Sequence, residues 1–286
     1  MGPRDAVTGK ALNSETTPNP TLFRVSIIDY LNAAPLNYGF KYGLGLGRFQ
    51  LKFQVPSACS DSLRDGSADA GLISSIECLR IPGLKIVPGL CIASPHKVRS
   101  VVILSKVPPE SIQTLALDAS SRSSAVLAQI ILREKYGAQP AVLEMPPNIE
   151  TMLEAHDAAL MIGNKAMMAN RQGLVTLDLA EEWNACTGLP AVFALWAIKE
   201  DAPKLDISGG ASSIFHQSFE LGKNNIENII DIACREIGWT KQEIREYLTE
   251  NLSFELGKAE MDSLSLFFEK AAKLGFAPEN RGLEFV

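Results

Sequence analysis

The sequence has few of the residues from which metal sites and nucleophile sites are usually built. It contains three histidines and five cysteines among 286 residues, and no two cysteines form a C-x-x-C pair. The histidines (His96, His156 and His216) lie far apart, so no Ser-His-Asp, Cys-His or metal-ligand spacing occurs. We expect any enzyme of this sequence to work largely without histidine, metal or nucleophile. The scattered cysteines favour buried free thiols in a reducing compartment over disulfides.

Long apolar runs and an excess of one charge are also missing. No stretch approaches the roughly 20 apolar residues of a membrane-spanning helix. Residues 1–20 are polar and lack the apolar centre of a signal peptide, so we expect a disordered leader. The 27 basic residues stand against 33 acidic ones, which argues against a nucleic-acid partner. We therefore expect a cytoplasmic protein with neither a membrane nor a nucleic-acid partner. The sequence leaves the oligomeric state open.

Short apolar segments alternate with helical ones from Val25 onward, which is typical of α/β architecture. The predicted strands are 23–28, 51–55, 69–73, 85–90, 99–105, 114–117, 141–144, 158–162, 174–177 and 192–198. The predicted helices between them are 57–66, 122–136, 148–155 and 164–171. After Ala202 the strand signal fades, and helical patterns follow at 210–236, 240–250 and 259–274.

Two predicted strands, 99–105 and 191–198, are long and apolar and bracket a compact α/β block. One domain interrupted by another and joined by two crossing strands favours a two-lobed fold. In such folds the ligand lies between the lobes, and closure is a hinge motion. We predict one lobe from 21–103 plus 198–286 and the other from 104–197. Periodicity alone does not establish this topology.

The segment VSIIDYLNAAPL, residues 25–36, leads from a β-branched strand into a polar loop that carries Asn32. Ligands of open α/β sheets lie just beyond the carboxyl ends of strands. An Asn there offers two N–H donors and one acceptor to an oxygen-rich ligand without adding charge. The alternative is an Asn that closes an Asx-turn or caps the next helix. Similar polar loops recur downstream, and this recurrence favours the ligand role.

Serines occupy several comparable positions. Ser57 lies at a predicted helix start and is able to cap it. Ser74 and Ser75 lie at the carboxyl end of a predicted strand, where ligand contacts are expected. Ser100 begins the 99–105 strand and would face the cleft between the lobes. Each of these serines also has a purely structural interpretation as a cap, turn or strand residue, and that alternative stays open.

The sharpest local signal lies in residues 115–137. An apolar strand ends at Asp118, a turn containing Ser121, Arg122, Ser123 and Ser124 follows, and an amphipathic helix starts near Ser123. Helix-start N–H groups beside hydroxyls form a site that favours carboxylate or phosphate, and Arg122 is placed to add a bidentate clamp. An over-supplied N-cap is the alternative. Walker-type glycines and lysine are absent, which excludes a phosphate loop.

Two later segments repeat the theme of a polar group where one element gives way to the next. Asn164 follows a strand and precedes a helix, and Thr187 with Gly188 ends a helical stretch before the 191–198 strand. We count Asn164, Thr187 and Gly188 as candidate substrate contacts. Trp183 and Trp196 are assigned to core or hinge packing in preference to ligand stacking.

Six motifs, in their order along the chain, resemble those of the chorismate dehydratase family: DYLNAAPL, GSADAGLISSIE, RSVVILS, LDASSRSS, MIGNKAM and TGLPAVFALW. Each motif alone is weak, but six in register are specific. The resemblance runs from about Phe23 to the C-terminal helices. It implies a type II periplasmic-binding-protein fold and a cytoplasmic enzyme of the futalosine route to menaquinone. That enzyme converts the small molecule chorismate into 3-[(1-carboxyvinyl)oxy]benzoate and water without a cofactor.

By resemblance, Asn32 and Ser100 match the polar residues that this family keeps at the reacting centre, and they are the candidate catalytic pair. The Ser121–Ser124 turn matches the family's carboxylate-binding loop. Two departures are present: Asn164 stands where the family usually has Asp, and Ala191 stands where it usually has Phe. Because Asn caps a helix as well as Asp does, we expect the fold to tolerate the first departure.

The implied chemistry is an elimination that creates a benzene ring from a dianionic substrate. The ring carboxylate acidifies the departing proton, so donors that hold this carboxylate would stabilise the developing carbanion. The substrate's own side-chain carboxylate is a candidate base, while the protein orients the substrate and excludes water. Two alternatives remain: a non-enzymatic small-carboxylate binding protein of the same fold, and the related naphthoate synthase, which would act on a larger bicyclic substrate.

Overall fold

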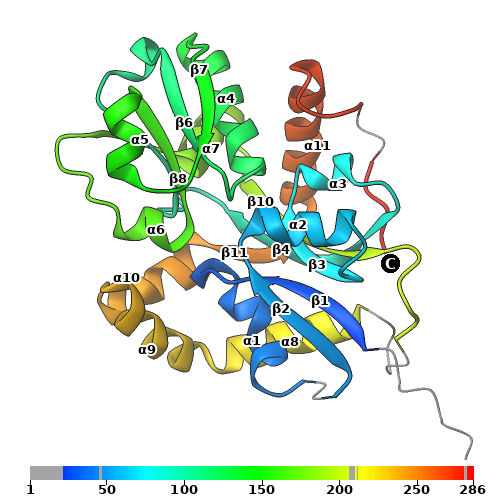
Figure 1. Ribbon diagram of the computed structural model, residues 1–286. Coiled ribbons are helices and arrows are strands. Elements are labelled where there is room, and N and C mark those ends of the chain that lie inside the picture. Colours follow the sequence, from blue (N-terminus) through cyan, green and yellow to red (C-terminus); the bar gives the residue numbers. More distant parts are fainter. Residues whose placement is uncertain (1–21, 45–46, 206–209, 211, 280–281) are drawn as a thin grey trace, which may run out of the picture.

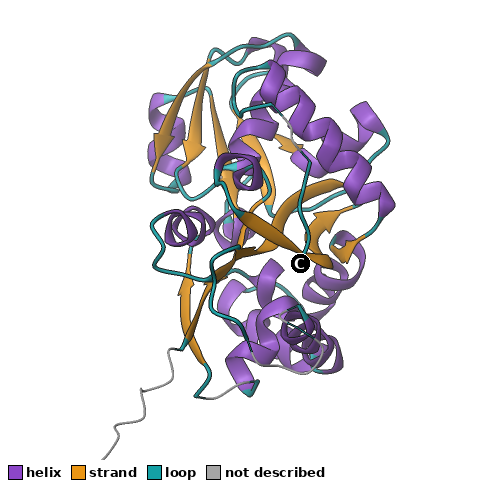
Figure 2. Cartoon of the chain, turned by 90° about the vertical axis from the view of Figure 1, so that its right-hand side faces the viewer, coloured by secondary structure: helices purple, strands orange, loops and turns teal. Residues whose placement is uncertain are grey.

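A computed structural model describes residues 22–44, 47–205, 210, 212–279 and 282–286 of the chain (Figure 1). Over these residues the strands form two sheets, one above the other in Figure 1, and each sheet is flanked by helices. Figure 2, a view turned by 90°, shows helices packed along both groups of strands. The leader expected at residues 1–20 lies outside the described residues. No helix in the described ranges is long and apolar enough to cross a membrane.

The first sheet has six strands in the described part of the chain. Their order is β11 (Ser253–Leu256), β4 (Leu84–Ser94), β10 (Ala191–Lys199), β3 (Ala70–Ser74), β1 (Phe23–Ile28) and β2 (Phe49–Gln54). The strand β1 runs parallel to β2 and β3, whereas β10 runs antiparallel to β3 and β4. The central strands β3 and β10 are buried because helices cover both faces of their apolar sequences.

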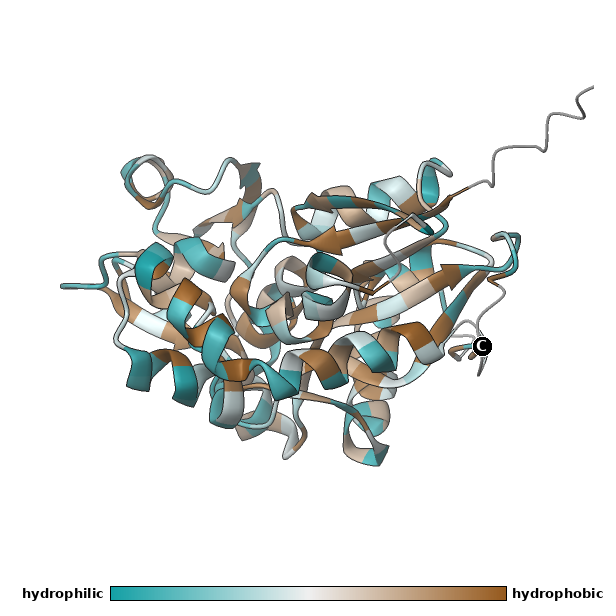
Figure 3. Cartoon of the chain, turned by 90° about the horizontal axis from the view of Figure 1, so that it is seen from below, coloured by the Kyte–Doolittle hydropathy of each residue, from teal (hydrophilic) through white to brown (hydrophobic). Residues whose placement is uncertain are grey.

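The first sheet is flanked by α1 (Ala34–Tyr42), α2 (Pro56–Arg64), α3 (Glu77–Arg80), α8 (Ser213–Asn224), α9 (Ile226–Ile237), α10 (Lys241–Glu246) and α11 (Lys258–Lys273). A 3-10 turn, η1 (Leu31–Ala33), precedes α1, and a π-helical turn, η3 (Tyr247–Asn251), follows α10. The helices α1 and α8 pack closely at Gly222 because this residue has no side chain. A Cβ there would lie 2.0 Å from the Pro35 carbonyl oxygen. Figure 3 shows hydrophilic and hydrophobic residues alternating along the helices, as expected for helices with one buried face.

The second sheet has five strands over the described residues. Their order is β7 (Ala141–Met145), β6 (Thr114–Asp118), β8 (Ala158–Ile162), β5 (Val101–Ser105) and β9 (Val175–Asp178). Its helices are η2 (Pro109–Ser111), α4 (Ser123–Tyr136), α5 (Ile149–Ala155), α6 (Gly163–Met168) and α7 (Leu179–Thr187). We call the first sheet with its helices the first lobe and the second sheet with its helices the second lobe.

The chain passes between the two sheets through short connections. The strand β5 pairs with β8 and β9 of the second sheet, and β10 pairs with β3 and β4 of the first. Each of these strands thus lies within one sheet along its whole length. We therefore place the lobe boundaries at 95–100 and 188–190. The boundaries expected from the sequence, 103/104 and 197/198, fall inside β5 and β10. Apolar sequence alone does not reveal this, because the partners of a strand lie far along the chain.

The helix α11 connects the lobes by packing on β10 of the first lobe and α4 of the second (Figure 1). Trp183 of α7 donates its indole N–H to the Ser263 hydroxyl of α11 at 2.9 Å. Trp196 lies in the first-lobe core with its ring centroid 4.8 Å from that of Phe215. Trp183 and Trp196 are both buried, which confirms the predicted packing role.

Candidate functional site

A cavity lies between the lobes, where the carboxyl ends of β1, β3 and β8 meet beside β10. Five of the candidate residues line it: Asn32 and Ser74 from the first lobe, and Ser121, Ser123 and Ser124 from the second. Its volume of ≈ 30 Å³ has room for about two or three water molecules, which is far less than a six-membered ring needs. The structure is therefore closed around this cavity, which we call the interlobe cavity. A ligand of the size of a ring can enter only when the lobes move apart.

Asn32 is the central residue of η1, the turn that follows β1. The N-cap positions of η1 and α1 belong to Tyr30 and Ala33, and neither helix start has a side-chain cap. The amide oxygen of Asn32 is buried and has no hydrogen-bond partner among the described residues. A buried acceptor without a donor costs about 1–3 kcal/mol, which a ligand O–H or N–H would relieve. The alternative of a cap or Asx-turn is therefore not realised by this oxygen.

The start of α4 carries the serine turn to the interlobe cavity. Arg122 occupies the N-cap position, but its side chain makes no capping hydrogen bond, so the over-supplied cap is not formed. The Ser123 hydroxyl accepts a hydrogen bond from the Ile76 N–H at 3.0 Å and lies 3.0 Å from the Ser75 hydroxyl in the other lobe. Ser124 lines the cavity at the N-terminus of this 14-residue helix, where the helix dipole favours a negative charge.

Arg122 does not line the interlobe cavity. Its guanidinium donates to both carboxylate oxygens of Asp61, at 2.8 and 2.9 Å, and to Glu77 at 2.9 Å. Asp61 lies on α2 and the buried Glu77 on α3, both in the first lobe. The bidentate grip expected of Arg122 is therefore made on carboxylates of the opposite lobe. In the closed structure this side chain joins the lobes and is not a ligand contact.

Ser100 is fully buried but does not line the interlobe cavity. Its hydroxyl accepts a hydrogen bond from the Tyr247 hydroxyl at 2.8 Å. Burial raises the pKa of Tyr247 well above its usual value, so this phenol stays a neutral donor. The carbonyl oxygen of Ser100 accepts from the N–H of Gly163 at 2.8 Å. Asn32 and Ser100 thus do not share this cavity in the closed structure.

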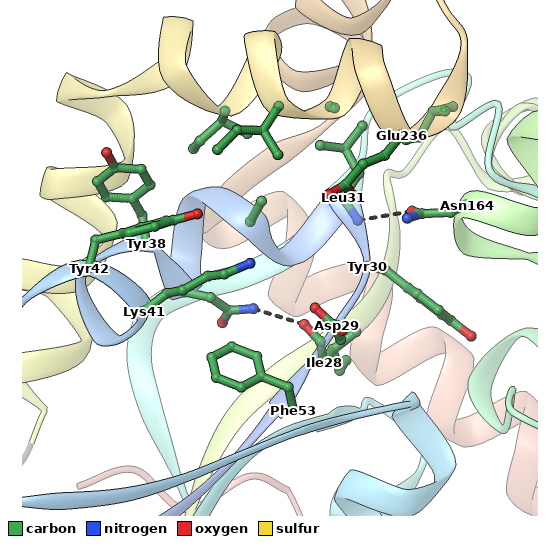
Figure 4. A pocket seen from close by; sticks show the side chains of 16 residues that line it. Ile28, Asp29, Tyr30, Leu31, Tyr38, Lys41, Tyr42, Phe53, Asn164 and Glu236 are labelled. Atoms are coloured by element: carbon green, nitrogen blue, oxygen red, sulfur yellow. Dashed lines mark hydrogen bonds between the residues drawn. The ribbon is translucent and has the colours of Figure 1, made fainter.

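Asn164 lies on α6 and binds the turn that carries Asn32. Its side-chain oxygen accepts a hydrogen bond from the Leu31 N–H at 3.0 Å, drawn as a dashed line in Figure 4. Leu31 belongs to the first lobe and Asn164 to the second, so this bond crosses between them. A carboxylate oxygen would accept the same hydrogen bond, so the structure accommodates Asn in place of the expected Asp.

Ser57 lies beside the interlobe cavity without lining it. It is the second residue of α2, which has Val55 as its N-cap and Pro56 at its first position. The predicted capping role is wrong because Pro56, pre-set for the first helical position, starts the helix one residue earlier. The Ser57 N–H donates to the Ser120 carbonyl at 3.0 Å, which is another bond between the lobes.

Thr187 and Gly188 also lie away from the interlobe cavity and instead end α7. The Thr187 hydroxyl donates to the Trp183 carbonyl at 2.8 Å and accepts from the Leu189 N–H at 3.1 Å. Gly188 has a φ of 70°, the left-handed conformation that commonly follows a helix. The segment contributes to the cavity further on, through Phe193 of β10.

A hydrogen-bonded chain that the sequence pattern does not reveal begins at the cavity wall with Tyr30. The Tyr30 hydroxyl lies 3.1 Å from the Ser120 hydroxyl, which donates to the Asp118 carboxylate at 2.6 Å. Burial raises the pKa of Asp118 and of Tyr30, and hydrogen bonding with Ser120 offsets part of each shift. Tyr30 and Asp118 both lie within motifs quoted above, DYLNAAPL and LDASSRSS. Their side-chain hydrogen bonds, however, are visible only once both lobes are placed.

Gly163 is needed where Tyr30 meets the second lobe. It has a φ of 61°, and a Cβ there would lie 2.6 Å from the Tyr30 ring. Only a residue without a side chain allows this conformation and this close approach. The glycine of the fifth motif, MIGNKAM, therefore has a structural reason that joins it to the first motif, DYLNAAPL.

The chain matches a protein family described as menaquinone biosynthesis over residues 23–273. The matched region includes both lobes and every residue of the interlobe cavity. The chain belongs to this family. The resemblance inferred from the six motifs is thereby confirmed.

Two curated relatives, both named chorismate dehydratase, are similar to this family member. The protein from Thermus thermophilus is 27% identical over 267 residues, which cover 87% of this chain and 94% of the relative. The protein from Campylobacter jejuni is 30% identical over 172 residues, which cover 58% of this chain and 63% of the relative.

Solved structures place the family member in a broader fold. The Archaeoglobus fulgidus protein AF1704 has a TM-score of 0.72 at 16% identity, with 88% of this chain and 97% of that one covered. The alkanesulfonate-binding protein SsuA from Xanthomonas axonopodis has a TM-score of 0.60 at 12% identity, with 92% and 96% covered. These likenesses, together with the two sheets, confirm the predicted two-lobed periplasmic-binding-protein-like α/β fold.

The donors around the interlobe cavity are hydroxyls, an amide and backbone N–H groups. Within the described residues, no group of three His, Cys, Asp or Glu side chains is arranged to hold a metal ion. Neutral donors at a helix start suit an anionic oxygen-rich ligand, and the apolar Ile28, Val101 and Phe193 suit a carbon ring.

Proposed function

We propose that this protein is a chorismate dehydratase. It would eliminate water from chorismate and release 3-[(1-carboxyvinyl)oxy]benzoate for menaquinone biosynthesis. The reaction is that of a carbon–oxygen hydro-lyase, and we propose that it needs no cofactor. The family membership and the names of the two curated relatives support the pathway and the reaction class.

The observation that carries the proposal is the unpaired amide oxygen of Asn32 opposite the start of α4. The Asn32 oxygen would accept a hydrogen bond from the ring hydroxyl of chorismate, while its amide N–H groups donate to an ether or carboxylate oxygen. The hydroxyls of Ser121 and Ser124, with the α4 dipole, would hold a carboxylate on the other side. The two lobes thus offer complementary halves of one site.

The same contacts explain how elimination would be accelerated. A carboxylate held by the α4 start carries more negative charge as the ring proton leaves, so these preorganised donors stabilise the transition state more than the ground state. Tyr30, which stays protonated because burial raises its pKa, lines the cavity and would present a neutral hydroxyl to the bound substrate. Closure of the lobes excludes water from the carbanion-like centre.

Among the described residues, neither an imidazole nor a carboxylate side chain lines the interlobe cavity. We therefore propose that the substrate's side-chain carboxylate removes the ring proton, while the protein holds it in a reactive orientation. Asp118 contacts Ser120 and the Ile162 N–H, and these bonds suit a supporting role.

Binding requires opening, because the interlobe cavity has room for only about two or three waters. We propose a hinge at 95–100 and 188–190, where the chain passes between the sheets. All five cysteines are free thiols, which suits a reducing compartment, and we place the enzyme in the cytoplasm.

The test is incubation of the purified protein with chorismate while the ultraviolet spectrum is recorded. We expect a new aromatic product whose mass is that of chorismate less one water. The rate should be unchanged by a metal chelator, and Asn32→Ala should lose most of it.

A protein that binds chorismate but produces no aromatic compound would instead be a binding protein of the same fold. Turnover of a bicyclic substrate in preference to chorismate would identify the naphthoate synthase. A rate abolished by the chelator and restored by a metal ion would contradict the cofactor-independent mechanism while leaving the reaction assigned.

A further inference from the structure

A second, larger cavity opens on the first lobe, outside the interlobe cavity (Figure 4). It has a volume of ≈ 260 Å³ and lies between α1, β2 and α9. Cavities of about 150 Å³ are large enough to bind benzene, so this one has room for a substituted single ring. We call it the α1–α9 cavity.

The walls of the α1–α9 cavity are suited to an aromatic ring. The cavity is lined by the aromatic side chains of Tyr38, Tyr42 and Phe53 and by apolar residues of α9, among them Ile229 and Ala233. Apolar walls with a few polar groups are typical of small-molecule sites. In Figure 4, the Lys41 side chain extends across the cavity between the Tyr42 and Phe53 rings.

Asn37 supplies a second unpaired acceptor, distinct from that of Asn32. Its side chain is 4% exposed, and its amide N–H donates to the Ile28 carbonyl at 2.9 Å. This bond fixes the orientation of the amide, because the reverse orientation would set two oxygens against each other. The Asn37 oxygen is buried and has no partner among the described residues. Because Asn37 lines the α1–α9 cavity, a ligand O–H or N–H that reaches this oxygen would relieve the cost of leaving it unpaired.

The charges around the α1–α9 cavity define the charge of its ligand. Lys41 is the one cation among the described residues that line it, and its ammonium lies 5.7 Å from the Tyr42 ring centre and 5.9 Å from that of Phe53. Asp29 and Glu236 line the same cavity. A single carboxylate is able to pair with Lys41, whereas a second negative charge would meet these two carboxylates.

We propose that the α1–α9 cavity binds a single-ring aromatic monocarboxylate that carries a hydroxyl or amino group on the ring. The ring lies between the aromatic side chains and α9, the carboxylate pairs with Lys41, and the ring hydroxyl or amino group donates to Asn37. This site takes a monoanion, in contrast to the dianion proposed for the interlobe cavity. The binding proposal does not depend on the dehydratase reaction.

The two cavities share a wall. Ile28 and Tyr30 line both, and Asn164 of the second lobe lines the α1–α9 cavity while holding the N–H of Leu31. A ligand there contacts both lobes in their closed arrangement. Its affinity should therefore be lowered in Asn164→Ala, which removes one bond of that arrangement.

The test is calorimetric titration of the protein with 4-hydroxybenzoate, benzoate and terephthalate. We expect 4-hydroxybenzoate to bind about tenfold more tightly than benzoate, because benzoate leaves the Asn37 oxygen unpaired. Terephthalate, a dianion, should bind more weakly than either. Failure of 4-hydroxybenzoate to bind at millimolar concentration, or equal affinity for all three compounds, would overturn the proposal.

Variants locate the bound ligand. Lys41→Met should weaken 4-hydroxybenzoate binding by about three- to tenfold, the scale of a partly exposed ion pair with hydrogen bonding. Ala233→Phe should abolish binding by filling the cavity, provided that its thermal unfolding stays cooperative. Lys52→Met is the matched control, because Lys52 is an exposed lysine of β2 that does not line the cavity.

Binding at the interlobe cavity would give the opposite pattern. Asn32→Ala and Ser124→Ala should leave 4-hydroxybenzoate affinity unchanged, although both are expected to impair the dehydratase. If these two variants lose binding while Lys41→Met and Ala233→Phe retain it, the ligand lies between the lobes and the proposal is wrong. If the unchanged protein binds 4-hydroxybenzoate at this cavity but does not convert chorismate, the dehydratase assignment is contradicted while the α1–α9 site stands.

Discussion

The side-chain oxygen of Asn164 accepts a hydrogen bond from the backbone N–H of Leu31, 3.0 Å away, across the boundary between the lobes. Leu31 directly precedes Asn32, whose amide oxygen is unpaired at the interlobe cavity. The second lobe therefore positions a residue of the first through its backbone, and closure and site assembly are one event.

Replacement of Asn164 tests this coupling. Asn164→Ala removes one neutral hydrogen bond from the closed form, so we expect the KM for chorismate to rise about fivefold, with a smaller change in kcat. Asn164→Asp keeps an acceptor and should stay within about twofold of the unchanged protein. Steady-state kinetics of the two variants provide the measurement. Equal losses in both would show that the amide group itself, and not its acceptor oxygen, is required.

Asn32 is expected to contribute directly to turnover. Asn32→Ala removes a preorganised donor and acceptor and should lower kcat by something like 100-fold, the scale found for single oxyanion-type donors. Because the Asn32 oxygen has no partner in the protein, the variant should be at least as stable to urea as the parent. Near-normal turnover, or a large loss of stability, would make Asn32 a structural turn residue.

Arg122 is expected to act through lobe closure. Its three hydrogen bonds to Asp61 and Glu77 exist only when the lobes are together. Arg122→Met should therefore raise the KM for chorismate about tenfold, since a smaller fraction of the protein is closed. Small-angle scattering of the variant with ligand should report a larger radius than that of the parent.

Arg64 offers a matched control for this prediction. It also pairs with Asp61 and Glu77, but all three residues belong to the first lobe. Arg64→Met should leave KM and the scattering radius close to those of the parent. If both arginine variants behave alike, the effect comes from the charge of the acidic pair and not from a bond between the lobes.

The pH dependence of stability should reflect the Arg24–Asp69 pair. Burial alone would raise the pKa of Asp69, but three hydrogen bonds and the charge of Arg24 outweigh it, so this pKa is lowered. Stabilisation by this carboxylate is complete above the usual Asp pKa of about 3.9 and is lost as the pH falls through the lowered value. Asp69→Asn should cost about 2 kcal/mol at pH 7 and less at pH 3, measured by urea unfolding.

Asp262 provides the control for this pH effect. It is half-exposed and pairs with Lys258 one turn away on α11. Asp262→Asn should change the free energy of unfolding by less than about 0.5 kcal/mol at either pH. A cost for Asp69→Asn that stays constant between the two pH values would exclude the ionised carboxylate as its source.

Most of the fold could be predicted because buried strands leave continuous apolar runs. The strand β11 was missed because it has only four residues, SFEL, of which Phe254 alone is buried, and because it lies between two helical segments. The helix α1 was also missed, since Pro35 reads as an interruption although it lies in the first turn of the helix, where proline is tolerated. The sheet to which each of β5 and β10 belongs could not be predicted, because strand pairing joins residues that are distant in sequence.

The interlobe cavity could be predicted where strand ends carry polar residues. Asn32, Ser74 and the serines at the start of α4 were found in this way and lie together. The sequence does not reveal which hydroxyls are already hydrogen-bonded to other groups of the protein. Ser100 is bonded to Tyr247, and Thr187 to its own helix, and both partners were invisible beforehand.

The last prediction concerns the base. His156 and His216 are each hydrogen-bonded to a backbone carbonyl, those of Met152 and Pro88, and His96 is exposed. None of the three lines the interlobe cavity, so each His→Ala variant should keep its turnover within about twofold. The pH profile of kcat/KM should then lack a limb near the ~6.5 of an ordinary histidine. If the substrate's side-chain carboxylate is the base, a chorismate analogue with that acid esterified should bind weakly and not eliminate water. Elimination from the ester at a comparable rate, or one histidine variant that stays folded but loses activity, would require a base supplied by the protein.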